Sequence, residues 1–212
     1  MIDWYRQKAW AKENKDEFFT KLGRSRKDNR AQYLRIQAIE LFETKDDALI
    51  LIAEALLKQV LNDYPDNDFE RGCVLQQLGE IYRFRGEIEN AIYFFKAAYD
   101  FEKVYPNVKT QAYLDYSVLI IKTKATKFFG EVETILLDKS PSLLFPVEKY
   151  IVYSLLSIIN RYKSNLTEAK HYAALANQNA NATTSGLRNH KGLGVVDIRD
   201  SLLDKFVIEG LN

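Results

Sequence analysis

The side chains best suited to nucleophilic chemistry or to metal binding are one cysteine and two histidines. Cys73 is the single thiol, and His171 and His190 are the two imidazoles. A cysteine nucleophile needs a base within hydrogen-bond reach, and neither histidine is near Cys73 in the sequence. The histidines lack a metal-site spacing such as His-Glu-X-X-His, and too few soft ligands are present for a zinc site. We therefore expect a structural thiol at Cys73, no enzyme activity, and no metal or other cofactor.

Two further patterns are of the kind that contact phosphate groups. A lone Gly-X-Gly at Gly192 and Gly194 has no third glycine and no preceding strand, so it favours a turn over a phosphate cradle. The densest basic cluster lies in residues 21–35, with Tyr33 among its cations; these are Lys21, Arg24, Arg26, Lys27, Arg30 and Arg35. It suits contact with phosphates or with an acidic partner, but no groove-reading motif accompanies it. A solvated helix and turn is therefore the favoured interpretation.

Two alternative functions follow from these patterns. One is an enzyme within a helical scaffold that uses Cys73 or a carboxylate pair such as Glu87 and Glu89, one of which would need burial and a shifted pKa. The other is nucleic-acid binding through residues 21–35, for which a steep salt dependence of binding is the signature.

The composition favours long helices. The 212 residues are 47% hydrophobic and include only nine Gly and four Pro, which allows a sizeable core and few tight turns. The start of the chain lacks the apolar stretch of a signal peptide, and the longest apolar runs are far shorter than the about 20 residues that span a bilayer. We expect a cytoplasmic protein with no membrane partner.

Charge is distributed unevenly although the net charge is only +1. Residues 1–35 carry a net charge of +5 and residues 36–104 a net charge of −7. The small total means that no bulk field recruits nucleic acid or an anionic membrane. The basic start is suited to an acidic region of a partner or of a second copy, so a homodimer is compatible with this pattern.

Residues 72–105 contain two apolar stripes at helical spacing, separated at Gly86. The stripes consist of Leu75, Leu78 and Tyr82, followed by Ala91, Phe95 and Ala98. This pattern predicts a helix, a turn and a second helix. Gly79 within the first helix costs about 1 kcal/mol relative to Ala, and a close crossing opposite Ala91 and Ala98 would offset that cost.

This unit resembles the tetratricopeptide repeat family, whose repeat is about 34 residues long. The residues that match the large, small and aromatic positions of the repeat are Leu75, Leu78, Gly79, Tyr82, Ala91, Phe95 and Ala98. Weaker copies occupy about residues 31–65, 110–141 and 147–176. The first of these has a longer turn near Thr44 to Asp47. A leading helix at 14–24, and an irregular cap with a closing helix at 177–212, complete a single predicted domain; within the cap, residues 177–185 are predicted to be a linker.

The resemblance implies an all-α fold, a right-handed α-solenoid of stacked antiparallel helix pairs in a TPR-like superhelix. The first helix of each pair lines a concave groove. Carried over to this sequence, the groove residues of the family include Arg35, Ile39, Phe42, Gln76, Glu80, Arg83, Phe84, Gln111, Leu114, Val118, Arg161 and Tyr162.

The resemblance also implies a non-catalytic module that binds a peptide or partner protein in this groove, as an adaptor or as an inhibitor of the immunity-protein type. The candidate anchors are Phe42, Phe84, Leu114 and Tyr162, oriented by Arg35, Arg83 and Arg161. The family's carboxylate clamp is not predicted, because only Arg35 matches it. In the alternative arrangement the closing helix fills the groove by packing on apolar residues such as Leu114, Val118 and Ile158.

Overall fold

The computed structural model describes residues 3–211, which form an all-helical structure of two compact units. The division falls between Ala112 and Tyr113, and we call the parts the N-terminal and C-terminal units. The all-α prediction is confirmed for the described residues. The stacking of every helix pair into one right-handed array stays a prediction, and each unit is described by itself.

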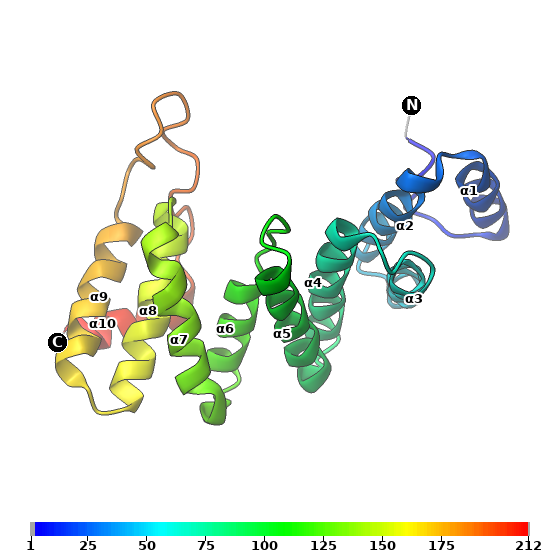
Figure 1. Cartoon of the computed structure of the whole chain (residues 1–212). Helices are drawn as coiled ribbons and strands as arrows, with labels where there is room; N and C mark the ends of the chain where they lie inside the picture. Colours follow the sequence, from blue (N-terminus) through cyan, green and yellow to red (C-terminus); the bar gives the residue numbers. More distant parts are fainter. Residues whose placement is uncertain (1–2, 212) are drawn as a thin grey trace. The chain divides into compact units, whose positions relative to one another are not determined.

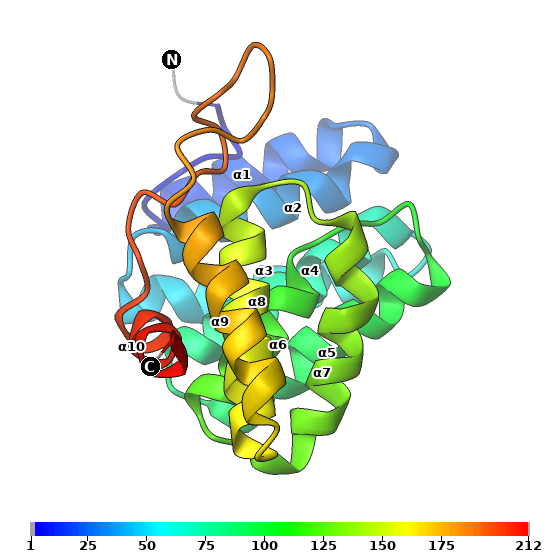
Figure 2. The same ribbon diagram turned by 90° about the vertical axis from the view of Figure 1, so that its left-hand side faces the viewer.

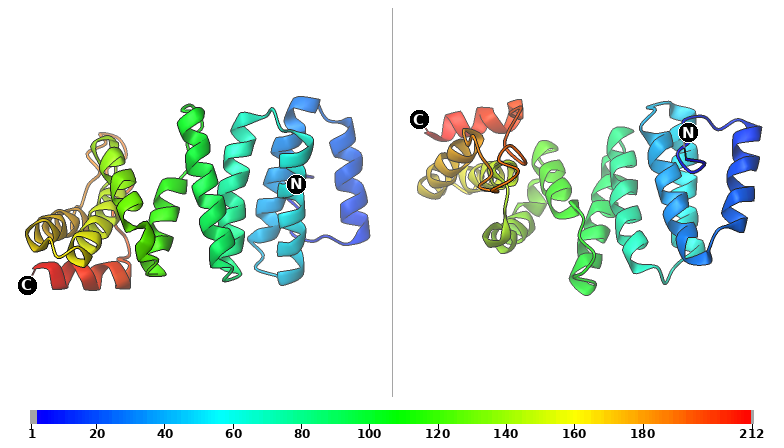
Figure 3. Two further views of the ribbon diagram at one scale, coloured as in Figure 1. Left: turned by 60° about the horizontal axis from the view of Figure 1, so that its bottom comes forward. Right: turned by 90° about the horizontal axis from the view of Figure 1, so that it is seen from above.

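The N-terminal unit consists of one leading helix and two helix pairs. Its helices are α1 (Lys12–Arg24), α2 (Lys27–Phe42), α3 (Asp47–Asp63), α4 (Asp68–Phe84) and α5 (Ile88–Val104). Helices α2 to α5 pack in sequence order, each against the next (Figures 1 and 3). The helices expected at 14–24, 31–65 and 72–105 are therefore present.

The turns of this unit follow from short polar and left-handed residues. Asp46 precedes α3, and its Oδ1 accepts a hydrogen bond from Leu49 N at 3.0 Å, which satisfies one of the free N–H groups at the helix start. Asn67 does the same for Glu70 N at the start of α4. The α2–α3 turn contains Lys45 with φ 60°, a left-handed conformation that a non-glycine residue rarely adopts.

The predicted close crossing at Gly79 is real, but its partner differs from the expected one. A Cβ on Gly79 would lie 2.5 Å from Cδ1 of Phe95, so the ring of Phe95 occupies the space that a side chain would need. Ala91 and Ala98 are fully buried on the same stripe. The alanines therefore flank the crossing, and an aromatic ring fills it.

The segment before α1 is held by a buried glutamine of α2. Gln37 is fully buried; its Oε1 accepts from Gln7 N at 3.0 Å and its Nε2 donates to Gln7 O at 2.6 Å. Trp4 and Trp10 place their rings 5.5 and 5.3 Å from the buried ring of Phe18 in α1. Residues 3–10 are therefore part of the folded unit.

The C-terminal unit consists of two helix pairs and a closing helix. Its elements are α6 (Ala112–Lys122), the 3-10 turn η1 (Thr126–Phe128), α7 (Phe129–Lys139), the 3-10 turn η2 (Ser140–Ser142), α8 (Pro146–Tyr162), α9 (Leu166–Ala180) and α10 (Ser201–Leu211). Helices α8 and α9 form its closest pair, and α10 packs against both (Figure 2). A hydrogen bond of 2.9 Å from Tyr116 Oη to Glu131 Oε2 links α6 to α7.

The boundary of the predicted cap at residue 177 is wrong, because α9 continues to Ala180. Ala180 is buried on the same stripe as Ala173 and Ala176, and Asn179 Nδ2 donates to Leu175 O at 2.8 Å. These contacts keep the polar end of the helix in place, so the predicted linker is helical over residues 177–180.

The rest of the cap is irregular and lies against the last helix pair, as predicted. Val147 N in α8 donates to Gly194 O at 2.9 Å, and a Cβ on Gly194 would clash with the ring of Phe145. Among the helices of residues 3–211, none combines the length and apolar character needed to cross a bilayer.

Candidate functional site

The N-terminal unit contains a pocket of about 320 Å³ between α2, α3 and α4, which we call the α2–α4 pocket. Four of its ten lining residues belong to the groove predicted from the sequence: Ile39, Phe42, Gln76 and Glu80. The pocket therefore brings together predicted residues that are about 40 positions apart in the chain. The neighbouring predicted residue Phe84 is 47% exposed at the end of α4.

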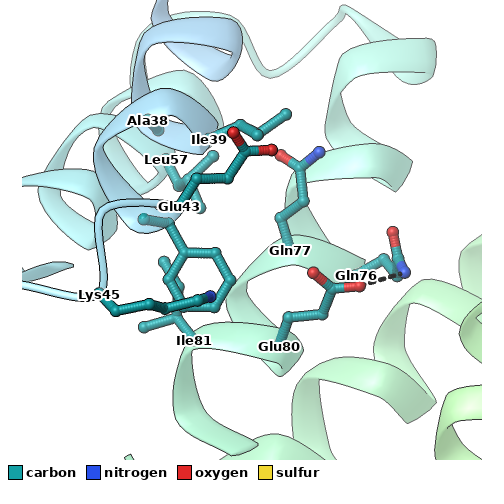
Figure 4. A pocket seen from close by; sticks show the side chains of 10 residues that line it. Ala38, Ile39, Glu43, Lys45, Leu57, Gln76, Gln77, Glu80 and Ile81 are labelled. Atoms are coloured by element: carbon teal, nitrogen blue, oxygen red, sulfur yellow. Dashed lines mark hydrogen bonds between the residues drawn. The ribbon is translucent and has the colours of Figure 1, made fainter. Parts of the chain in front are cut away.

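The pocket has an apolar floor and a polar rim. Ala38, Leu57 and Ile81 are buried and come from α2, α3 and α4, respectively. Glu43 and Lys45, from the turn after α2, contribute to the rim together with α4 side chains (Figure 4). An apolar floor supplies binding energy, and a few placed polar groups orient a ligand.

The rim of the α2–α4 pocket is rich in hydrogen-bond acceptors. Gln76 Nε2 donates to Glu80 Oε1 at 3.0 Å. Glu43, in the turn after α2, and Gln77 of α4 point toward one another (Figure 4). Gln77 Oε1 is buried without a hydrogen-bond partner, and the Glu43 carboxylate has no ion-pair or hydrogen-bond partner among the described residues.

Two aromatic rings and one cation lie at this rim. The rings of Phe42 and Phe84 meet edge to face with 5.7 Å between their centroids. Lys45 Nζ lies 3.6 Å from the Phe42 centroid and 4.8 Å from that of Phe84, within the range of cation–π attraction. Lys45 also extends into the pocket (Figure 4).

The predicted orienting arginines of this unit are engaged within it. Arg35 Nε forms an ion pair with Glu70 Oε2 that joins α2 to α4, and their side chains are only 14% and 5% exposed. The Arg83 guanidinium lies over the ring of Phe95, 5.4 Å from its centroid. Gln111, also predicted, is exposed just before α6. The main contact of Arg35 is therefore a structural one that holds α2 against α4.

In the C-terminal unit the predicted residues lie on α6 and α8. Leu114 and Val118 of α6 are half-buried. Tyr162 is 60% exposed, with its ring 5.0 Å from that of Phe129. Arg161 is held by α10, because its Nη1 pairs with Glu209 Oε2 at 3.1 Å and its Nη2 donates to Glu209 O at 2.8 Å.

The closing helix α10 packs on α8, which is the contact that the alternative arrangement expects of it. Ile158 of α8 and Leu203 and Val207 of α10 are buried. A pocket of about 340 Å³ remains beside them, which we call the α8–α10 pocket. Its lining is mainly apolar and includes Arg161, Tyr162, Ile121, Phe129, Leu202 and Phe206.

Several residues of the alternative functions are buried or engaged within the chain. Burial raises the pKa of the half-buried Cys73 thiol, which favours the uncharged form. In the basic cluster, Lys21 pairs with Glu17 at 2.7 Å and Arg30 donates to Gly23 O at 2.6 Å. Within residues 3–211, no group of three or more potential ligands is arranged to hold a metal ion.

Sequence reasoning missed Lys45 as a site residue. It lies in the longer turn near Thr44 to Asp47, where the repeat pattern provides no equivalent position. The extra length of that turn was the available signal. Gln77 is not among the predicted groove residues, yet its Oε1 is buried without a hydrogen-bond partner in the pocket.

Comparison with known proteins adds no relative: no protein-family model, no curated protein and no solved structure matches the chain. The arrangement of residues in the two pockets is therefore the basis for the function proposed next.

Proposed function

We propose that the chain is a non-catalytic protein-binding module, and that a peptide or projecting segment of a partner protein binds at the α2–α4 pocket. The observation that carries this proposal is the acceptor-rich rim around an apolar floor, beside the half-buried ring of Phe42 and the exposed ring of Phe84. The module is a TPR-like, right-handed solenoid of stacked antiparallel helix pairs in this proposal.

The chemistry of the pocket supports capture of a side chain rather than catalysis. Micromolar affinity needs about 8 kcal/mol of binding free energy, which a few buried anchors supply when polar groups fix their orientation. A partner side chain on the apolar floor would bury against Leu57 and Ile81 and contact Phe42, whose ring meets that of Phe84 just outside the pocket lining. The raised pKa of Cys73 disfavours the thiolate that a nucleophile needs.

The α8–α10 pocket is the weaker candidate for partner binding. Two of its three cations are already paired within the chain, Lys122 with Asp200 and Arg161 with Glu209, so a partner that binds these cations would have to displace those contacts. We therefore assign the partner site to the N-terminal unit. A module of this kind acts as an adaptor or as an inhibitor that blocks a partner, and its lone thiol suits the reducing cytoplasm.

The test begins with identification of a chain captured from the native host and continues with that chain purified. The double variant Phe42→Ala/Phe84→Ala should raise the Kd by about 30-fold or more, equivalent to a hot spot of about 2 kcal/mol. Tyr93→Ala is the matched control, because Tyr93 is an exposed aromatic residue of the same unit that does not line the pocket. A folded double variant with an unchanged Kd would show that the site is elsewhere.

The same purified material separates this proposal from nucleic-acid binding. If the chain shifts RNA or DNA with a steep salt dependence, and substitution of Arg24, Arg26 and Lys27 removes the shift, residues 21–35 form the functional surface instead. These three residues are exposed, so their substitution leaves the core intact.

A further inference from the structure

We infer that the α2–α4 pocket recognises the guanidinium group of an arginine side chain presented by the partner. This inference rests on the proposed function and names the chemistry of its anchor. Three independent features of the pocket support it: acceptors without donors, an aromatic face already in contact with a cation, and the charge of the surrounding segment.

The first feature is an excess of acceptors. Gln77 Oε1 is buried and unpartnered, and Glu43, which points toward Gln77, has no partner among the described residues (Figure 4). A buried acceptor without a donor costs free energy that a donor from a ligand would recover. A guanidinium group carries five N–H donors in a planar fork and no acceptor, so it fits an acceptor pair of this kind.

The second feature is the contact of Lys45 with the aromatic pair. Lys45 Nζ lies over the ring of Phe42 at 3.6 Å and near that of Phe84 at 4.8 Å. The ammonium group thus occupies the position that a cationic ligand would take. An arginine is the better occupant, because its planar guanidinium stacks on an aromatic face and is less strongly hydrated than an ammonium group.

The third feature is charge. Residues 36–104, which supply all ten lining residues, carry a net charge of −7. Lys45 is the only cationic residue among those that line this pocket, whereas Glu43 and Glu80 are both acidic. Displacement of Lys45 by an arginine therefore replaces one cation with another and leaves the carboxylates compensated. An anionic ligand would meet repulsion from both of them.

The test uses two small probes that differ in charge and almost nothing else. N-acetyl-arginine amide is titrated into isotope-labelled protein and followed by NMR, with the neutral isostere N-acetyl-citrulline amide as the comparison. We expect millimolar binding of the arginine probe with shifts at the pocket residues. We expect the citrulline probe to bind about fivefold more weakly or worse, because it lacks the charge that strengthens both contacts.

Two variants connect the binding to named groups. Lys45→Met removes the internal competitor but keeps an unbranched side chain, so the arginine probe should bind about threefold more tightly or better. Lys124→Met is the matched control, because Lys124 is a second left-handed lysine, with φ 54°, in the C-terminal unit. Glu43→Gln should weaken binding of the arginine probe about threefold or more by removing one charged acceptor.

Three results would overturn the inference. These are equal binding of the two probes, weaker binding by Lys45→Met, and no effect of Glu43→Gln. The last result would mean that the side-chain amide of Gln77 is rotated by half a turn, which exchanges Oε1 and Nε2. Gln77 Nε2 would then donate a hydrogen bond to Glu43, and no donor from a ligand would be required. Unfolding midpoints of all variants establish that each is folded under the NMR conditions.

The outcome also distinguishes this inference from the proposed function. If the arginine probe fails to bind while Phe42→Ala/Phe84→Ala loses the protein partner, the pocket binds its partner through other chemistry and only this inference fails. If the probe binds as expected while the double variant keeps its partner, the pocket is a cation site and the partner binds elsewhere.

Discussion

The two pockets have nearly the same volume, about 320 Å³ for the α2–α4 pocket and about 340 Å³ for the α8–α10 pocket, but opposite chemical character. The first has carboxylates at its rim, one of which, on Glu43, lacks a partner among the described residues. The second has cations, of which Lys122 and Arg161 pair with Asp200 and Glu209. Two of the three cations in the second pocket are thus paired within the chain, whereas the first pocket leaves the Glu43 carboxylate and Gln77 Oε1 without a partner among the described residues.

The difference comes from one element, α10. The closing helix buries Leu203 and Val207, each about 1% exposed, and packs on α8 and α9. It also supplies Glu209 to Arg161. In the C-terminal unit, α10 therefore covers the apolar face of the pair α8 and α9. It shows how a helix from a partner protein could cover an apolar face of this kind.

The largest expected effect is a loss of stability when the buried face of α10, which packs on α8, is truncated. Leu203→Ala should destabilise the C-terminal unit by about 2–5 kcal/mol, because it leaves a cavity at a fully buried site. Ile208→Ala on the same helix is the control, since Ile208 is 53% exposed and its loss should cost far less. Urea unfolding measures both. Equal losses would mean that α10 does not complete the unit through its buried face.

The next effect concerns the crossing of α4 and α5 in the N-terminal unit. Gly79→Ala should cost about 1–3 kcal/mol, because its Cβ would lie 2.5 Å from the Phe95 ring and the core would have to shift. Gly23→Ala in α1 meets nothing within 4 Å and should be neutral or stabilising by up to about 1 kcal/mol. Thermal or urea unfolding distinguishes them; a stable Gly79→Ala protein would contradict the close crossing.

An acid-side effect is expected in the N-terminal unit. Burial acts to raise the pKa of Glu54, but hydrogen bonds from Lys58 and Tyr82 lower it. The resulting pKa lies below the ordinary value of 4.5. Because the folded-state pKa is the lower one, the stabilisation is complete well above pH 4.5 and is lost as the pH falls through the folded value. Glu54→Gln should cost about 1–2 kcal/mol at pH 7.

The pH dependence provides the check on Glu54. The difference in unfolding free energy between the native chain and Glu54→Gln should shrink as the pH falls below 4.5. A difference that stays constant down to the lowest accessible pH would show that ionisation of Glu54 is not linked to folding.

The smallest effect is expected on the alkaline side of the C-terminal unit. Burial, together with the nearby Asp204 and Asp200, raises the pKa of Tyr150 from 10.0 to about 12. The neutral phenol is favoured in the folded state, so its contribution is complete below pH 10 and is lost as the pH rises through about 12. Tyr150→Phe should flatten the fall in stability over this interval. An unchanged slope would contradict the shift.

The helices could be predicted from local pattern, because apolar stripes at helical spacing mark buried faces in residues 72–105 and 147–176 alike. The end of α9 was placed too early because residues 177–180 look polar. There, buried Ala180 and the Asn179 side-chain bond decide the outcome, and both depend on the folded surroundings.

Part of the lining of the α2–α4 pocket could also be predicted from local pattern. Repeat positions located Ile39, Phe42, Gln76 and Glu80, because these depend on helix phase alone. The ion pair of Arg35 with Glu70 joins residues 35 positions apart, and no local pattern indicates that it is formed. Lys45 was missed because its role depends on a left-handed backbone in an inserted turn.

The contact between Gln37 and Gln7 has a practical consequence. The carboxamide of Gln37 imitates a peptide group and forms both hydrogen bonds that a neighbouring strand would form with Gln7. Proteolytic removal of residues 3–10 would leave the carboxamide of Gln37 without these two hydrogen bonds and would expose Phe18. Recombinant versions of the protein should therefore retain these residues, and limited proteolysis at this stretch should report early opening of the N-terminal unit.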